Sequence, residues 1–137
     1  MFKVKIIAIG RSKEPWLNAA LFEYEKRLQG RLKITWLFAD DDEELLELCK
    51  NEPLLIALAI EGKPFTSVAF SKEWMKLGFK GAFVIGGPNG LPSEVLQRAQ
   101  FRWSLSPLTF TNQMARLILV EQLYRALEIQ RGSPYHK

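Results

Sequence analysis

Residues 82–90 read AFVIGGPNG, a short apolar run followed at once by three glycines within five residues. An apolar run without alternation is typical of a strand covered on both faces. Glycines directly after such a strand allow positive φ angles and let a ligand approach amide groups that a Cβ would shield. The spacing matches neither the dinucleotide fingerprint nor the P-loop. Two interpretations stand, a plain turn and a ligand-facing loop. Because a plain turn needs only one glycine, the second is favoured.

The flanking segments alternate between strand-like and helix-like patterns. Further strands are expected at residues 2–9, 32–38, 54–60 and, weakly, 102–105. Helices are expected from a cap at Ser12 to about residue 28, from Asp40-Asp41-Asp42 to about residue 50, at about 67–77, for two turns from a cap at Ser93, and at 112–130. The alternation predicts one α/β domain over residues 1–137, with a mostly parallel sheet of five to six strands and helices on both faces.

Ligands of such sheets bind beyond the carboxyl ends of the strands. That rule selects three expected loops, at residues 61–64, 86–90 and 106–112. The segment 103–110 reads WSLSPLTF, and Pro107 prevents it from continuing as a central strand. This apolar loop either packs onto the last helix or lines a pocket. In a pocket, backbone hydrogen bonds and the side chains of Leu105 and Leu108 could hold a flat ring such as adenine.

Composition describes an ordinary globular chain of 137 residues, with 19 Lys and Arg against 15 Asp and Glu, one Cys and one His. No apolar run approaches the roughly 20 residues of a membrane span, and no signal peptide is evident, so a cytoplasmic protein is expected. The single Cys and single His leave no metal-binding constellation. Residues 40–53 carry seven acidic and one basic side chain, so the rest of the chain is strongly basic, which suggests a polyanionic partner such as RNA.

The expected last helix is apolar almost all round between Met114 and Val120. One sheet cannot bury the whole perimeter of such a helix. Either the helix is sandwiched within the monomer, or its outer face meets a second copy of the chain, and the small size of the chain favours a homodimer.

Three motifs and the end of the chain together resemble one family. They are Ile85-Gly86-Gly87-Pro88-Asn89-Gly90-Leu91, Trp103-Ser104-Leu105-Ser106, Leu123-Tyr124-Arg125-Ala126 and the terminal Tyr135-His136-Lys137. In this combination the chain is similar to the ribosomal RNA large-subunit methyltransferase H family of the SPOUT class. The resemblance implies a C-terminal trefoil knot, S-adenosylmethionine bound inside the knot, and a homodimer formed near the last helix. It also implies methylation of N3 of a pseudouridine in 23S rRNA on the assembled ribosome.

Motif matching implies which residues act. The cofactor contacts fall on Leu58, Gly86, Leu105, Ser106, Pro107, Leu108, Thr109 and Phe110. Contact with the target base falls on His136 and Tyr135, with Arg125 as a phosphate or base partner; the alternative for Arg125 is a structural ion pair. In a dimer, the tail could complete the neighbouring site.

Two departures from the family pattern stand out. Thr111-Asn112 replaces a frequent Pro-His, and the acidic segment between the second and third strands looks short. Two rival functions remain: a non-catalytic ribosome-associated RNA-binding factor, and a SPOUT methyltransferase acting on tRNA. The glycine loop with the apolar 105–110 segment argues against the first, and the Tyr-His tail argues against the second.

Overall fold

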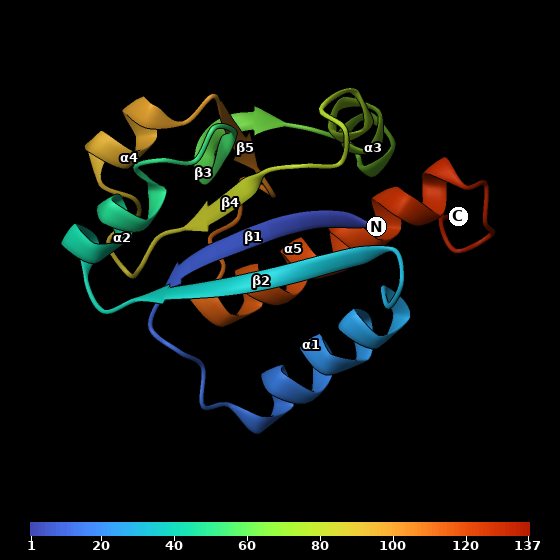
Figure 1. Cartoon of the computed structure of the whole chain (residues 1–137), viewed down its shortest axis with the longest axis horizontal. Coiled ribbons are helices and arrows are strands. Elements are labelled where there is room, and N and C mark those ends of the chain that lie inside the picture. Colours follow the sequence, from blue (N-terminus) through green and yellow to red (C-terminus); the bar gives the residue numbers. More distant parts are fainter.

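The computed structural model describes residues 1–137 as a five-stranded parallel sheet with helices on both faces (Figure 1). The strand order is β2-β1-β4-β3-β5, and every pairing is parallel. The elements are β1 (Phe2–Ile9), α1 (Pro15–Arg27), β2 (Leu32–Ala39), α2 (Asp42–Cys49), β3 (Leu55–Pro64), α3 (Ser67–Lys76), β4 (Ala82–Ile85), α4 (Ser93–Arg98), β5 (Phe101–Ser104) and α5 (Asn112–Gln130). The α/β class and the parallel sheet are thereby confirmed.

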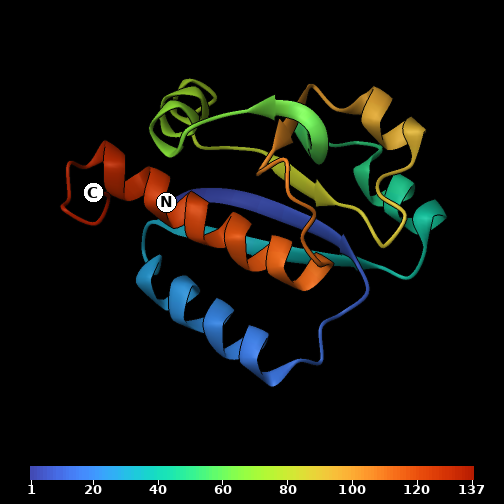
Figure 2. The ribbon, with the colours of Figure 1, turned by 180° about the vertical axis from the view of Figure 1, so that it is seen from behind.

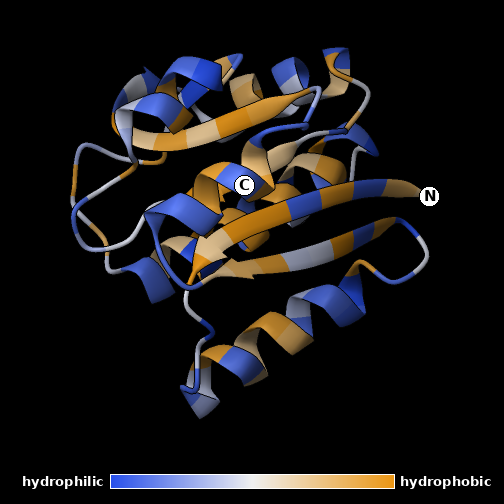
Figure 3. Cartoon of the chain, turned by 60° about the vertical axis from the view of Figure 1, so that its left-hand side comes forward, coloured by the Kyte–Doolittle hydropathy of each residue, from blue (hydrophilic) through white to orange (hydrophobic).

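The helices divide between the two faces of the sheet. Helices α1, α3 and α5 cover one face, and α2 and α4 cover the other (Figures 1 and 2). Each face has its own apolar core, with 18 buried residues on the α5 side and nine on the α2 side. In Figure 3, hydrophobic residues concentrate along the strands. Burial of this apolar surface on both faces holds the layers together.

Helix α5 is sandwiched within the monomer on most of its perimeter. It lies on the sheet between α1 and α3, and Leu119, Val120 and Leu123 are fully buried (Figure 2). No element covers its outer side in Figure 2. Met114, in the first turn of α5, is 39% exposed. The monomer therefore buries one side of α5 and leaves another open, and the homodimer stays a prediction. None of the helices is long and apolar enough to cross a membrane.

The prediction that residues 61–64 form a loop is wrong, because β3 continues to Pro64. The register against β5 shifts between Leu58 and Lys63, so the continuation begins with a bulge. Beyond Ala57, β3 has left its other neighbour β4 and pairs only with β5, where a proline breaks no central ladder. A Cβ on Gly62 would lie 2.7 Å from the carbonyl carbon of Arg102, so glycine is what permits this close pairing.

Two of the expected helix caps are also wrong. The first helix begins after Glu14, without a side-chain cap, and the hydroxyl of Ser12 accepts a hydrogen bond from the Glu14 amide instead. Proline at the first helical position lacks an N–H, so fewer donors there need a cap. Ser93 is the first residue of α4, and Pro92 takes the capping position. Asp41 does cap α2, as the acidic run predicts.

Candidate functional site

A cavity of about 820 Å³ opens at the carboxyl edge of the sheet, where the topology predicts a ligand site. Its walls come from the ends of β1 and β4, the bulged part of β3, and the segment that joins β5 to α5. Seven of the eight expected cofactor contacts line it, namely Leu58, Gly86, Leu105, Ser106, Leu108, Thr109 and Phe110. Pro107 does not line it, although both of its neighbours do. Sequence motifs far apart in the chain thus meet around one space.

The glycine loop after β4 is a tight turn as well as a cavity wall. A Cβ on Gly86 would lie 2.5 Å from the carbonyl carbon of Gly90, so the loop closes only over glycine. Gly90 has φ +80°, and its amide donates to the Gly87 carbonyl at 3.0 Å. The turn therefore requires two of the three glycines for its own geometry. Residues 85–91 also line the cavity, so the ligand-facing interpretation and the turn interpretation describe the same loop.

The 105–110 segment forms a second wall of the cavity. Ser106 organises it, because its hydroxyl accepts from the Leu108 amide at 3.0 Å and its carbonyl accepts from the Ser104 hydroxyl at 3.1 Å. Leu108 is 68% exposed, so this side chain does not pack onto α5. The segment lines the cavity and offers it an apolar surface, while Leu105 also packs against the core on the α5 side. Such a wall suits a flat aromatic group better than it suits water.

The Thr111-Asn112 departure has a structural role. The Thr111 hydroxyl accepts from the Met114 amide at 3.2 Å and caps α5. The Asn112 side-chain amide donates to the Gly86 carbonyl at 2.6 Å, which ties the start of α5 to the glycine loop. The polar pair thereby holds the two walls of the cavity together.

Arg116 is a lining residue that sequence reasoning missed. It lies one turn beyond Asn112 on α5 and is only 3% exposed. Its Nη2 donates to the Ile9 carbonyl at 2.8 Å and to the Gly10 carbonyl at 2.6 Å. Burial lowers the pKa of Arg116, and no carboxylate pairs with it. The available signal was a lone cation within the otherwise apolar stretch 114–120.

The three expected catalytic side chains meet in a cluster at the other end of α5. Arg125 Nη1 lies 3.0 Å from His136 Nδ1, and the Arg125 guanidinium lies over the Tyr135 ring at 4.8 Å. Because a guanidinium can only donate, His136 Nδ1 accepts, and the ring proton of the neutral imidazole is on Nε2. Burial, together with a hydrogen bond to Tyr24, raises the pKa of Tyr135 to about 12, so its phenol stays protonated near neutral pH.

Arg125 also satisfies the alternative interpretation, because its Nε donates to both carboxylate oxygens of Glu121, at 2.9 and 3.1 Å. The hydrogen bond with Glu121 raises the pKa of Arg125, and burial, which would lower it, is the smaller effect. The Arg125 guanidinium therefore contacts the Glu121 carboxylate, the His136 imidazole and the Tyr135 ring at the same time, and it holds these side chains together.

The cavity and the C-terminal cluster are separated by most of the length of α5. Asn112 lies at the cavity, and Arg125 follows 13 residues later on the same helix. At 1.5 Å per residue the two positions are about 20 Å apart. Figure 2 shows the two ends of α5 at opposite sides of the molecule. The cluster of one chain therefore does not reach the cavity of the same chain.

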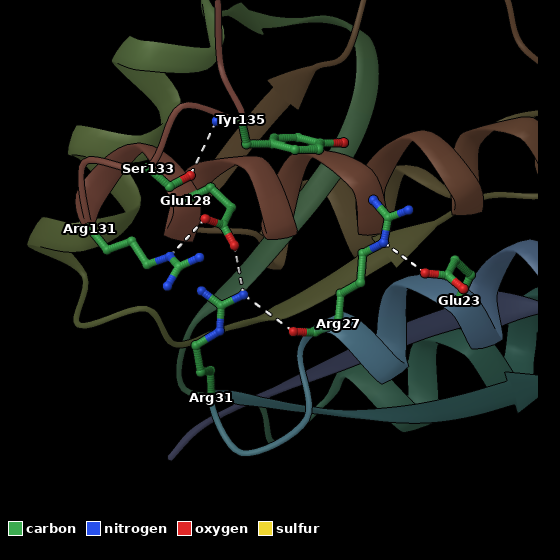
Figure 4. A network of polar contacts seen from close by, with 7 residues as sticks. All are labelled: Glu23, Arg27, Arg31, Glu128, Arg131, Ser133 and Tyr135. Carbon is green, nitrogen blue, oxygen red and sulfur yellow. Dashed lines mark hydrogen bonds and ion pairs between the residues drawn. The ribbon is translucent and has the colours of Figure 1, made fainter.

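A network around Glu128 holds the C-terminal end of α5 against the turn before β2 (Figure 4). The Glu128 carboxylate accepts from Arg31 at 2.9 Å and from Arg131 at 2.7 Å, and the residue is 1% exposed. Burial alone would raise its pKa, but hydrogen bonds from Arg131, Ser133, Arg31 and Tyr124 outweigh burial and lower the pKa to about 2. The fold thus strongly prefers the ionised carboxylate.

Glu128→Gln is expected to lower the free energy of unfolding by about 2 kcal/mol at pH 7, because the neutral amide gives up the charge-assisted hydrogen bonds that the buried carboxylate accepts from Arg31 and Arg131. The contribution is complete above the ordinary pKa of 4.5 and is lost as pH falls toward 2. Urea unfolding at pH 7 and pH 3 measures it. Glu47→Gln, at a side chain that is 71% exposed, is the matched control with little effect at either pH. An equal deficit at both pH values would contradict this assignment.

The chain matches known proteins over nearly its whole length. A family model described as a predicted SPOUT methyltransferase matches residues 2–136. A protein of Protochlamydia amoebophila named ribosomal RNA large subunit methyltransferase H is 48% identical over the full length of both chains. One of the same name from Prochlorococcus marinus is 46% identical, covering 98% of this chain and 96% of its own.

Two solved structures share the fold at low sequence identity. A probable methylase family protein from Haemophilus influenzae has a TM-score of 0.63 at 15% identity, covering 98% of this chain and 70% of that chain. The SpoU methyltransferase AviRb from Streptomyces viridochromogenes, solved in complex with AdoMet, has a TM-score of 0.51 at 11% identity, covering 96% and 59% respectively.

Proposed function

Because this chain belongs to the SPOUT methyltransferase family, we propose that it transfers a methyl group from S-adenosylmethionine to N3 of a pseudouridine in 23S rRNA of the assembled ribosome. The family uses S-adenosylmethionine, and the full-length relatives are named as large-subunit rRNA methyltransferases. The trefoil knot, implied by the resemblance, and a cytoplasmic location, expected from the composition, stay predictions for this chain.

The observation that carries the proposal is the cavity where the matched motifs meet. Its residues fit the proposed cofactor: the side chains of Leu58, Leu105 and Leu108 offer apolar surface for an adenine ring. The glycine loop brings backbone close to the cavity without an intervening Cβ. Its volume of about 820 Å³ lies within the usual range for small-ligand sites, so a cofactor and the edge of a base can share it.

The cofactor supplies a methyl group on a sulfonium sulfur. In the transfer, a bond forms between the pseudouridine N3 and that methyl carbon, the sulfur–carbon bond breaks with its electron pair going to sulfur, and the N3 proton is released. The main tasks left to the protein are alignment and stabilisation of the charge that develops on the base. The protonated Nε2 of His136 suits the second task, because it can donate a hydrogen bond to a carbonyl oxygen of the base.

A homodimer would bring this donor to the cavity. An outer stripe of α5 runs along helical spacing from the cavity end to the cluster; its members are Met114, Ile118, Glu121 and Arg125. In a twofold dimer that pairs the two stripes antiparallel, Arg125 of one chain would lie beside Met114 of the other. Each site would then combine the cavity of one chain with the tail of its partner, and this arrangement overcomes the separation of about 20 Å within a chain.

Sedimentation equilibrium tests the dimer directly. The wild-type chain is expected to be a dimer at micromolar concentration, and Ile118→Glu is expected to weaken dimerisation at least about 100-fold, because it buries an unpaired carboxylate in the interface. Phe22→Glu, at an α1 position that is 70% exposed and lies off the stripe, is the matched control and should remain dimeric. A wild-type monomer at micromolar concentration would refute the composite site.

Incubation with methyl-labelled S-adenosylmethionine tests the activity and the target together. Whole ribosomes, free 23S rRNA and tRNA serve as parallel substrates, and mass spectrometry of nuclease digests locates the label. Label on pseudouridine N3 from ribosomes is the expected result. Label confined to tRNA would overturn the target assignment only. An absence of cofactor binding by calorimetry would overturn the enzymatic proposal and leave the RNA-binding factor as the better alternative.

A further inference from the structure

The Arg116 guanidinium is a buried charge without a counter-ion. Two backbone carbonyls accept from Nη2, and the guanidinium carbon lies 5.5 Å from the centre of the Phe38 ring. Nε is sealed from solvent and has no hydrogen-bond partner. Nη1 makes no hydrogen bond either, but unlike Nε it is not sealed, and the residue lines the cavity. The guanidinium thus keeps a free donor on the cavity side.

The cavity around Arg116 has little negative charge to offset it. Its only other charged lining residues are Arg11 and Glu61, both of which are exposed. Carbonyl dipoles alone compensate a buried cation poorly, since a buried charge is costly unless it is paired. Helix α5 holds this cation at the cavity wall, one turn after Asn112, whose side chain is hydrogen-bonded to the glycine loop. An anionic ligand would supply the missing pair.

From this geometry we propose that Arg116 binds the carboxylate of the methionine moiety of the cofactor. The inference rests on the proposed function. Arg116 follows Asn112 by one helical turn, and Asn112 holds the carbonyl of Gly86, an expected cofactor contact. A carboxylate at the end of a small molecule can reach a donor that is almost fully buried. A phosphodiester, which carries a sugar on each side, is much bulkier at that point.

A thermodynamic cycle in calorimetry tests the assignment. The ligands are S-adenosylhomocysteine and its decarboxylated analogue, which differ only in the carboxylate. We expect the wild type to bind the first about 10- to 100-fold more tightly, as for one charge-assisted hydrogen bond. In Arg116→Gln the affinity for the first ligand should fall to within about threefold of the second, whose affinity should stay nearly unchanged.

Arg11→Gln is the matched control, because Arg11 lines the same cavity and lies over the same Phe38 ring at 5.1 Å. It should keep the wild-type ratio between the two ligands. Arg116→Lys preserves the charge and should retain part of the difference in affinity between the two ligands. This second variant keeps the test valid if Arg116→Gln loses its contacts with β1 and does not fold.

Three results would overturn the inference. A wild-type ratio near one would show that the carboxylate is not recognised. An equal loss for both ligands in Arg116→Gln would assign Arg116 a purely structural role. An unchanged ratio with a weakened affinity for ribosomes would assign the donor to an RNA phosphate. A wild type that binds neither ligand would instead overturn the proposed function itself.

Discussion

His136→Ala is expected to lower turnover at least about 100-fold while the dissociation constant of the cofactor changes less than about threefold. The reason is the position of the imidazole, which lies in the C-terminal cluster and not in the cavity that would hold the cofactor. A donor that acts on developing charge is worth about 10²- to 10³-fold in rate. Single-turnover methylation of ribosomes measures the first quantity, and calorimetry measures the second.

His136→Gln separates hydrogen-bond donation from proton acceptance. The glutamine carbonyl can accept from Arg125 while its amide nitrogen donates, which reproduces the arrangement of the neutral imidazole. We expect this variant to retain much more turnover than His136→Ala. Lys137→Ala, at the adjacent tail position, controls for general disturbance of the tail. If glutamine and alanine were equally damaging, His136 would act as a base; equal losses in turnover and cofactor affinity would place it in the cofactor site.

Gly86→Ala is expected to weaken cofactor binding about 10- to 100-fold, as for the loss of one or two hydrogen bonds to the displaced loop. The new Cβ would meet the Gly90 backbone at 2.5 Å, and backbone cannot rotate away as a side chain can. The turn must open, and the cavity wall moves with it. Calorimetry with S-adenosylhomocysteine measures the affinity, and thermal unfolding reports the lower stability that also follows.

Gly87→Ala is the matched control for this position. Its Cβ would meet only the side chain of Ile9, and the nearest atom is the terminal Cδ1, at 3.4 Å. Its affinity for S-adenosylhomocysteine should stay within about threefold of wild type. Similar affinities for the two variants would mean that the close approach of Gly86 to Gly90 does not shape the site.

The sequence predicts the fold well where the bounds of an element follow the spacing of its apolar residues. The strand at residues 2–9 and the helix at 112–130 have the predicted bounds because their apolar positions face a core. The extension of β3 escapes prediction, because Gly62 and Pro64 are ordinary breakers. Beyond Ala57, β3 no longer pairs with β4 and has β5 as its one neighbour, so this part of the strand tolerates Gly62 and Pro64.

The candidate site is predictable to the extent that motifs carry it. Gly86 and all of residues 105–110 except Pro107 converge on one cavity, as parallel strands require. Arg116 lies outside every motif, and its burial depends on how α5 meets the end of β1. The separation between the cavity and His136 also depends on the direction of α5 across the sheet, and local sequence does not encode that direction.

The first turn of α2 concentrates negative charge on one side of a chain whose net charge is positive. This turn carries Asp42, Glu43 and Glu44, all exposed, on the opposite side of the sheet from α5. Near a polyanion, repulsion of this acidic turn would favour orientations that keep α2 away from the polyanion. Pairing through α5 would keep both copies of α2 at the periphery. Orientation would then be selected before any contact forms, and this preference would fade as added salt shortens the range of the field.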